Sequence, residues 1–221
     1  MTADRETRPG GRAMAVVGLA LALFFALVSL GHYVFPGDGT GPMLGREAIF
    51  WLYALIAVLW VRYGEGLPLS TIGFRRPGWR TLLLALGGAV LLIATEAIHL
   101  SVIVPLFHLD ANTMMNRRDQ LVSLPLWFRV MLVVRAAVVE EILYRGFLIE
   151  KVRQVTGSTP LAFAVSVIAF IYAHLSGWGW VQLIPIFMAA VILAAMYVWR
   201  RDLPANIGAH FLTDAVGLLL G

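Results

Sequence analysis

Apolar residues along the chain form long runs, separated by short polar stretches rich in Arg, Gly and Pro. A helix needs about 20 mostly apolar residues to cross a hydrocarbon core of about 30 Å. Seven runs approach this length, and we expect each to form a membrane helix. They cover residues 13–35, 47–61, 79–104, 124–149, 160–174, 181–199 and 204–220. The second, fifth and seventh runs are short for a full crossing.

These runs predict an all-α fold, a polytopic membrane protein with about seven transmembrane helices. The composition agrees, because 60% of the 221 residues are hydrophobic and 14% are charged, against about 45–50% and about 25% in a soluble domain. No polar stretch between the runs is long enough to fold separately. We therefore expect residues 1–221 to form a single integral-membrane domain.

The net charge of +4 is interpreted as membrane orientation, and we expect no nucleic-acid partner. With a cytoplasmic N-terminus, most basic residues lie on the inner side, as the positive-inside rule requires. The inner set is Arg5, Arg8, Arg12, Arg62, Arg75, Arg76, Arg80, Lys151, Arg153, Arg200 and Arg201, and the outer set is Arg46, Arg117, Arg118 and Arg129. Abundant Arg, Ala and Gly beside one Lys suit a GC-rich bacterial genome, so we expect a bacterial plasma membrane.

The stretch between Gly64 and Gly78 would lie at the inner membrane surface. Its Phe74 and the following Trp79 are expected at the headgroup level, with the arginines facing anionic lipid. The lipid bilayer is thus one expected partner.

Cysteine is absent. Its absence excludes a disulfide framework, a thiolate nucleophile, Cys-ligated zinc and an iron–sulfur cluster. Glu, Asp, His, Ser and Arg remain as the residues that could carry chemistry, and we expect no cofactor and no metal.

Charged residues cluster within the apolar runs, although each costs at least about 2.5–3.5 kcal/mol near the bilayer centre. The cluster comprises Glu96 and His99 in the third run, Arg135, Glu140, Glu141 and Arg145 in the fourth, His174 at the end of the fifth, and His210 and Asp214 in the seventh. At about 1.5 Å per residue, the groups in the fourth, fifth and seventh runs reach the cytoplasmic half or the midplane of the membrane. Such agreement in depth indicates a common site.

Helical spacing separates the roles of the two adjacent acids. Glu141 and Arg145 are four residues apart, with the acid first, which favours an ion pair on one face. Glu140 is rotated by about 100° from Glu141, and one arginine cannot neutralise two acids. We therefore expect the face of Glu140 to be free to bind water.

A carboxylate and two imidazoles around a wet pocket could activate water and stabilise an oxyanion. His210 and Asp214, also four residues apart, share one helix face. The chemistry that these groups favour is hydrolysis of an acyl bond. Glu96 and Arg135 lie at comparable estimated depth, and we hypothesise an ion pair between their helices.

Three segments together resemble the signature motifs of the CPBP family, the CAAX-protease and bacteriocin-processing (Abi) intramembrane endopeptidases. They are Glu140-Glu-Ile-Leu-Tyr-Arg145, Phe170-Ile-Tyr-Ala-His174 and His210-Phe-Leu-Thr-Asp214. They occur in the family's order within residues 134–217, which would place a catalytic bundle in the later helices.

The resemblance implies a glutamate-dependent intramembrane protease acting on a membrane-associated peptide or protein. Glu140 would deprotonate the attacking water with help from His174, and His210 and Asp214 would form the oxyanion site. Glu141 and Arg145 would support the site. The family more often has Asn at the position of Asp214, so Asp214 either stays protonated or instead orients His210.

Three alternatives remain beside this interpretation. Zinc held by Glu140, His174 and His210 would give a metalloprotease, since two imidazoles and a carboxylate form a known catalytic set. A catalytically silent immunity or scaffold protein would keep the fold without turnover. A small transporter would also place charged residues at the midplane, although no internal repeat supports it.

Overall fold

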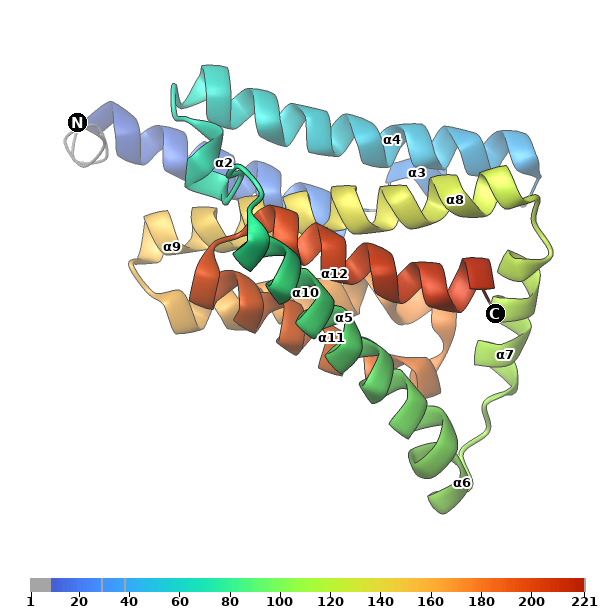
Figure 1. Cartoon of the computed structure of the whole chain (residues 1–221). Coiled ribbons are helices and arrows are strands. Elements are labelled where there is room, and N and C mark those ends of the chain that lie inside the picture. Colours follow the sequence, from blue (N-terminus) through green and yellow to red (C-terminus); the bar gives the residue numbers. More distant parts are fainter. Residues whose placement is uncertain (1–8, 29, 38, 221) are drawn as a thin grey trace.

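The structure is a computed structural model that describes residues 9–28, 30–37 and 39–220. All regular segments in these ranges are helical, which confirms the predicted fold class (Figure 1). The helices are α2 (Pro9–Leu27), α3 (Leu30–Val34), α4 (Thr40–Leu59), η1 (Trp60–Gly64), η2 (Leu69–Ile72), α5 (Trp79–Ile98), η3 (His99–Ile103), α6 (Val104–Leu106), α7 (Asn112–Val122), α8 (Leu126–Arg135), η4 (Ala136–Ile149), α9 (Glu150–Thr156), α10 (Thr159–Trp178), α11 (Trp180–Arg200), α12 (Leu203–Ala215) and η5 (Val216–Leu220).

Several of these helices are long and apolar enough to cross a membrane. Within the described residues there are four, namely Thr40–Gly64, Trp79–Leu106, Trp180–Arg200 and Leu203–Leu220. A fifth candidate combines α7 with the helix Leu126–Thr156, which are bent by 117°. Two shorter apolar helices, Ala13–Leu27 and Thr159–Leu175, lie where the first and fifth runs were predicted. The protein is therefore a polytopic membrane protein, with four or five candidate spans in the described residues instead of the seven expected, because two of the predicted runs form helices shorter than a full span.

The second span is longer than the apolar run 47–61 predicted. Its helix begins at Thr40 and continues to Gly64, because the mixed segments 40–46 and 62–64 on either side of the run keep the helical backbone. In the same way α10 continues past His174 to Trp178. His174 therefore lies inside a helix, one turn before its end.

The continuous helix Leu126–Thr156, formed by α8, η4 and α9, occupies the centre of the bundle. Its middle segment η4 contacts α2, α4, α10, α11 and α12, and the residues of η4 from Glu141 to Ile149 are all buried. The backbone of η4 is π-helical, a form that is usually limited to one turn and is frequent at functional sites.

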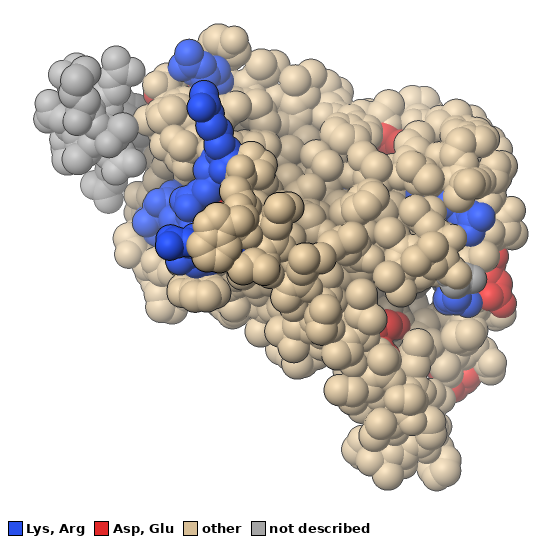
Figure 2. Space-filling view, in the orientation of Figure 1, with Lys and Arg blue, Asp and Glu red and all other residues tan. Residues whose placement is uncertain are grey.

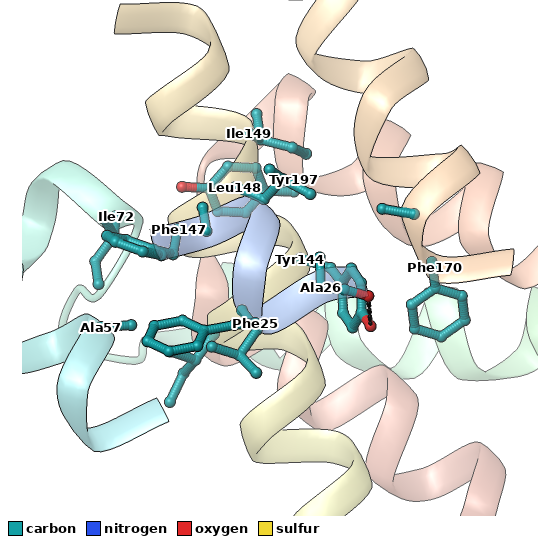
Figure 3. Close-up of a cluster of buried hydrophobic side chains, with 14 of the residues drawn as sticks. Phe25, Ala26, Ala57, Ile72, Tyr144, Phe147, Leu148, Ile149, Phe170 and Tyr197 are labelled. Atoms are coloured by element: carbon teal, nitrogen blue, oxygen red, sulfur yellow. Dashed lines mark hydrogen bonds between the residues drawn. The ribbon is translucent and has the colours of Figure 1, made fainter. Parts of the chain in front are cut away.

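Aromatic side chains hold the other helices against this central segment (Figure 3). Phe147 of η4 packs against Phe25 of α2, with ring centroids 6.5 Å apart. Tyr144 meets Phe170 of α10 edge-on at 5.1 Å. The Tyr144 hydroxyl also donates to the carbonyl oxygen of Ala26 at 3.4 Å. These contacts fix η4 and α10, which carry candidate site residues, in the core.

Caps fix the starts of the two later helices. The Ser158 hydroxyl accepts a hydrogen bond from the Leu161 amide at 3.3 Å at the start of α10. Asp202 caps α12 by accepting from the Ala205 amide at 3.2 Å. It also accepts from the Thr81 hydroxyl at 2.8 Å, which ties the start of α12 to the start of α5. Caps of this kind contribute about 1 kcal/mol each.

Exposed arginines gather at the end of the bundle where α4 ends, α5 begins and α11 ends (Figure 2). They are Arg62, Arg75, Arg76, Arg80 and Arg200, and we call this end the basic end. Arg5 and Arg8, which the sequence assigned to the same side, lie outside the described residues. Which side of a membrane the basic end faces stays a prediction.

Candidate functional site

Glu141 lies in a sealed polar network at the centre of the bundle. Both its side chain and that of Arg145 are fully buried, and Arg145 Nη1 donates to Glu141 Oε1 at 2.9 Å. The other oxygen, Oε2, accepts from Asn206 Nδ2 of α12 at 3.1 Å. His210 Nδ1, one turn further along α12, lies 2.9 Å from Oε1. The predicted pair of Glu141 and Arg145 is confirmed, and two residues of α12 join it.

Glu140 has different surroundings, although it is the next residue. Its Oε1 accepts a hydrogen bond from Arg135 Nη1 at 2.7 Å, and its side chain keeps 14% of its surface exposed. Arg135 also binds Glu47 of α4, through Nε at 2.6 Å and Nη2 at 3.4 Å. The guanidinium of Arg135 lies 4.8 Å from the ring centre of Phe50. Solvent can thus reach the Glu140 side chain, while Arg135 fixes its position.

The sequence analysis named no cationic partner for Glu140, and the structure supplies one in Arg135. Arg135 and Glu140 are five residues apart, which places them about 140° apart on an α-helix. In a π-helix, whose hydrogen bonds join residues five apart, they lie on the same face. The backbone of η4, which begins directly after Arg135, is π-helical. This geometry brings Arg135 to Glu140, so each of the two adjacent acids has its own arginine.

The hypothesised ion pair between Glu96 and Arg135 is also wrong. Arg135 is occupied by Glu47 and Glu140. Glu96 instead accepts a hydrogen bond from Gln182 Nε2 of α11 at 3.4 Å. The depth estimate was comparable for both residues, but it contains no information about which way each helix is turned.

His174 and His210 come from different helices and pack against one phenyl ring. The ring centre of His174 lies 4.5 Å from that of Phe170, and that of His210 lies 6.4 Å from it. His174 Nδ1 lies 2.7 Å from the carbonyl oxygen of Phe170. This contact fixes the ring and leaves Nε2 to face elsewhere.

Asp214 completes the group on α12. One of its oxygens lies 3.5 Å from His210 Nε2, and its side chain is 28% exposed. His210 therefore has a carboxylate on each ring nitrogen, Glu141 on Nδ1 and Asp214 on Nε2. This contact agrees with an orienting role for Asp214.

The two predicted catalytic acids, Glu140 and Asp214, lie within electrostatic range of each other and of both predicted histidines. Glu140 interacts with His174 and His210, and Asp214 interacts with Glu140, His174 and His210. The described residues bring no three His, Asp or Glu side chains close enough to hold a metal ion. The zinc set of Glu140, His174 and His210 thus lacks the geometry for a metal in this part of the chain.

Two site residues escaped the sequence analysis. Asn206 precedes His210 by four residues and Asp214 by eight, so the helical spacing that linked the latter two could have included it. Glu47 begins an apolar run more than eighty residues from its partner Arg135, and no spacing rule relates residues so far apart.

Residues 122–216 match the family described as type II CAAX prenyl endopeptidase Rce1-like. Residues 122–216 are therefore an Rce1-like family domain. This domain includes η4, α10, α11 and α12, and so all four candidate catalytic residues, whereas Glu47 and α5 precede it. The match confirms the resemblance seen in the three motifs. Comparisons with curated proteins and with solved structures gave no match.

Proposed function

We propose that the protein is an intramembrane endopeptidase that hydrolyses a peptide bond of a membrane-associated substrate with a glutamate-activated water. The observation that carries the proposal is the contrast in access within the Rce1-like domain. Glu141 is fully buried, whereas Glu140 is part-exposed and lies within electrostatic range of two imidazoles. Only a carboxylate that water can reach is able to act as the general base.

In the proposed reaction Glu140 Oε2 accepts a proton from the attacking water. Its Oε1 is occupied by Arg135, while Oε2 has no hydrogen bond to any described residue, so it is the oxygen available to water. The hydroxide forms a bond to the substrate carbonyl carbon, and the carbonyl electron pair moves to oxygen. Glu140 then passes the proton to the amide nitrogen as the C–N bond breaks. His174 assists by positioning the water.

His210 stabilises the oxyanion through Nε2. When Nδ1 donates its proton to Glu141, Nε2 carries a proton only in the doubly protonated ring, whose charge Glu141 and Asp214 balance. The Nε2–H is then shared between the oxyanion and Asp214, whose contact is long at 3.5 Å. Asp214 holds the ring rather than donating itself, because an ionised carboxylate has no proton to give. We further propose that the basic end faces the cytoplasm, as positive residues prefer.

The test is cleavage of a prenylated peptide that ends in a CAAX sequence by the full chain in proteoliposomes. Glu140→Gln and His174→Ala are each expected to lower kcat by about 10²–10⁴-fold, the usual contribution of general acid–base groups. Glu96→Gln is the matched control, because it changes a membrane-embedded acid outside the site, and we expect it to retain full activity.

Two results would contradict the proposal. Undiminished cleavage by Glu140→Gln would remove the base assignment. Loss of wild-type cleavage with a zinc chelator would favour the metalloprotease alternative. The same peptide without its prenyl group shows whether the lipid is part of what is recognised.

A further inference from the structure

A groove at the basic end of the molecule lies away from the Glu140 site. It runs between the start of α5 and the end of α11, and its volume is about 370 Å³. Trp79, Arg80, Leu83, Leu84, Trp199 and Arg200 line it. Each helix thus contributes a Trp-Arg pair, one at its first residues and one at its last.

The two arginines of this groove form no ion pair with any described residue. Arg80 lies over the Trp79 ring at 5.2 Å and Arg200 over the Trp199 ring at 5.5 Å. The neighbouring Arg201, by contrast, is bound to Glu150 at 2.7 Å and to the Thr71 carbonyl oxygen at 2.8 Å. Arg80 and Arg200 are therefore available to an anion.

The groove changes from polar to apolar along its length. Both helices are long enough to cross a membrane, so their ends lie at the headgroup level, where Trp and Arg are favoured. Trp79 and Trp199 are 67% and 73% exposed. Leu83 and Leu84 follow one turn further along α5, at the depth of the acyl chains. A ligand that fits has an anionic head and an apolar tail.

We propose that this groove binds an anionic phospholipid, with its phosphate between Arg80 and Arg200 and an acyl chain along Leu83 and Leu84. The surroundings favour a negative headgroup, because Lys and Arg side chains cover this end of the molecule while the acidic side chains in view lie mostly toward the other end (Figure 2). The positive N-terminus of α5 adds to the attraction. A soluble phosphate would use the arginines but leave the leucines unpaired.

The experiment is native mass spectrometry of the full chain purified from an equimolar mixture of phosphatidylglycerol and phosphatidylcholine. The wild type is expected to retain phosphatidylglycerol preferentially. The double variant Arg80→Gln and Arg200→Gln should lower that preference by about 30-fold, since each arginine near an anionic lipid contributes about 1 kcal/mol. Leu83→Asn should lower the retention of both lipids.

The matched control is Arg75→Gln with Arg76→Gln, which removes the same charge from exposed residues of the basic end outside the groove. It should keep the wild-type preference. An equal loss in this control would show a diffuse basic surface and overturn the site. So would an unchanged preference in the Arg80 and Arg200 variant, or displacement of the lipid by soluble glycerol phosphate. None of these outcomes depends on peptidase activity.

Discussion

The two adjacent glutamates of η4 lie in two different regions of the molecule. Glu141 is enclosed by Arg145, Asn206 and His210 and has no exposed surface. Glu140 shares Arg135 with Glu47 in a region where each of these three side chains keeps 10–15% of its surface exposed. Adjacent residues thus belong to two networks, one closed to solvent around Glu141 and one partly exposed around Glu140.

This difference indicates a division of labour. A carboxylate with three hydrogen-bond partners and no exposed surface is suited to joining helices, because its charge is already balanced. A carboxylate with one guanidinium partner and an exposed oxygen keeps the capacity to exchange protons with water. Under the proposed function, Glu141 serves stability and Glu140 serves chemistry, and substitutions at these two and three other acidic positions test this division.

The largest effect is expected for Glu141→Ala. The change leaves Arg145 buried without its ion-pair partner, which costs about 3–5 kcal/mol. A loss of this size lowers the melting temperature by about 10 °C in a chain of this length. Thermal unfolding in detergent, followed by tryptophan fluorescence, measures it. Glu140→Gln in parallel should melt within a few degrees of the wild type, and equal losses would erase the contrast.

The next effect concerns Glu47. Glu47→Gln removes one of the two carboxylates that bind Arg135. The charge of Arg135 then acts on Glu140 alone, which makes the Glu140 carboxylate a weaker base. We expect kcat for the prenylated peptide to fall about tenfold, which is 1.4 kcal/mol in the barrier, with KM unchanged. Glu47→Asp should restore much of the rate. A rise in KM without a change in kcat would instead indicate a purely structural role.

A smaller effect is expected at Asp214. Asp214→Asn keeps the shape and a polar contact to His210, so kcat should stay within about threefold of the wild type. Asp214→Ala removes the contact, and kcat should fall about tenfold because the ring loses its orientation. Steady-state cleavage measures both. If Asn and Ala behave alike, the contact at 3.5 Å does not orient the ring.

The smallest effect is expected for Glu96→Gln. Its carboxylate accepts a hydrogen bond from Gln182, which the amide oxygen of Gln can accept as well. The free energy of unfolding should change by no more than about 0.5 kcal/mol, as judged from the same melting curves. A large loss would mean that Glu96 belongs to a buried network like that of Glu141.

Much of the fold and part of the site could be predicted from the sequence. Runs of apolar residues indicate membrane helices regardless of packing, and four-residue spacing predicted the pair of Glu141 and Arg145. The partner of Arg135 could not be predicted, because α-helical spacing was assumed where the backbone is π-helical. Contacts between helices distant in the chain, such as Glu47 with Arg135, depend on helix rotation, which a single sequence does not specify.

The sealed network has a consequence for biosynthesis. Asn206 and His210 follow Glu141 by 65 and 69 residues, so the ribosome adds them long after the central helix. Until α12 emerges, Arg145, which lies on the same helix, can already neutralise Glu141 at the translocon. The central helix thus carries its own counter-ion during insertion, and α12 closes the network only after it has been synthesised in turn.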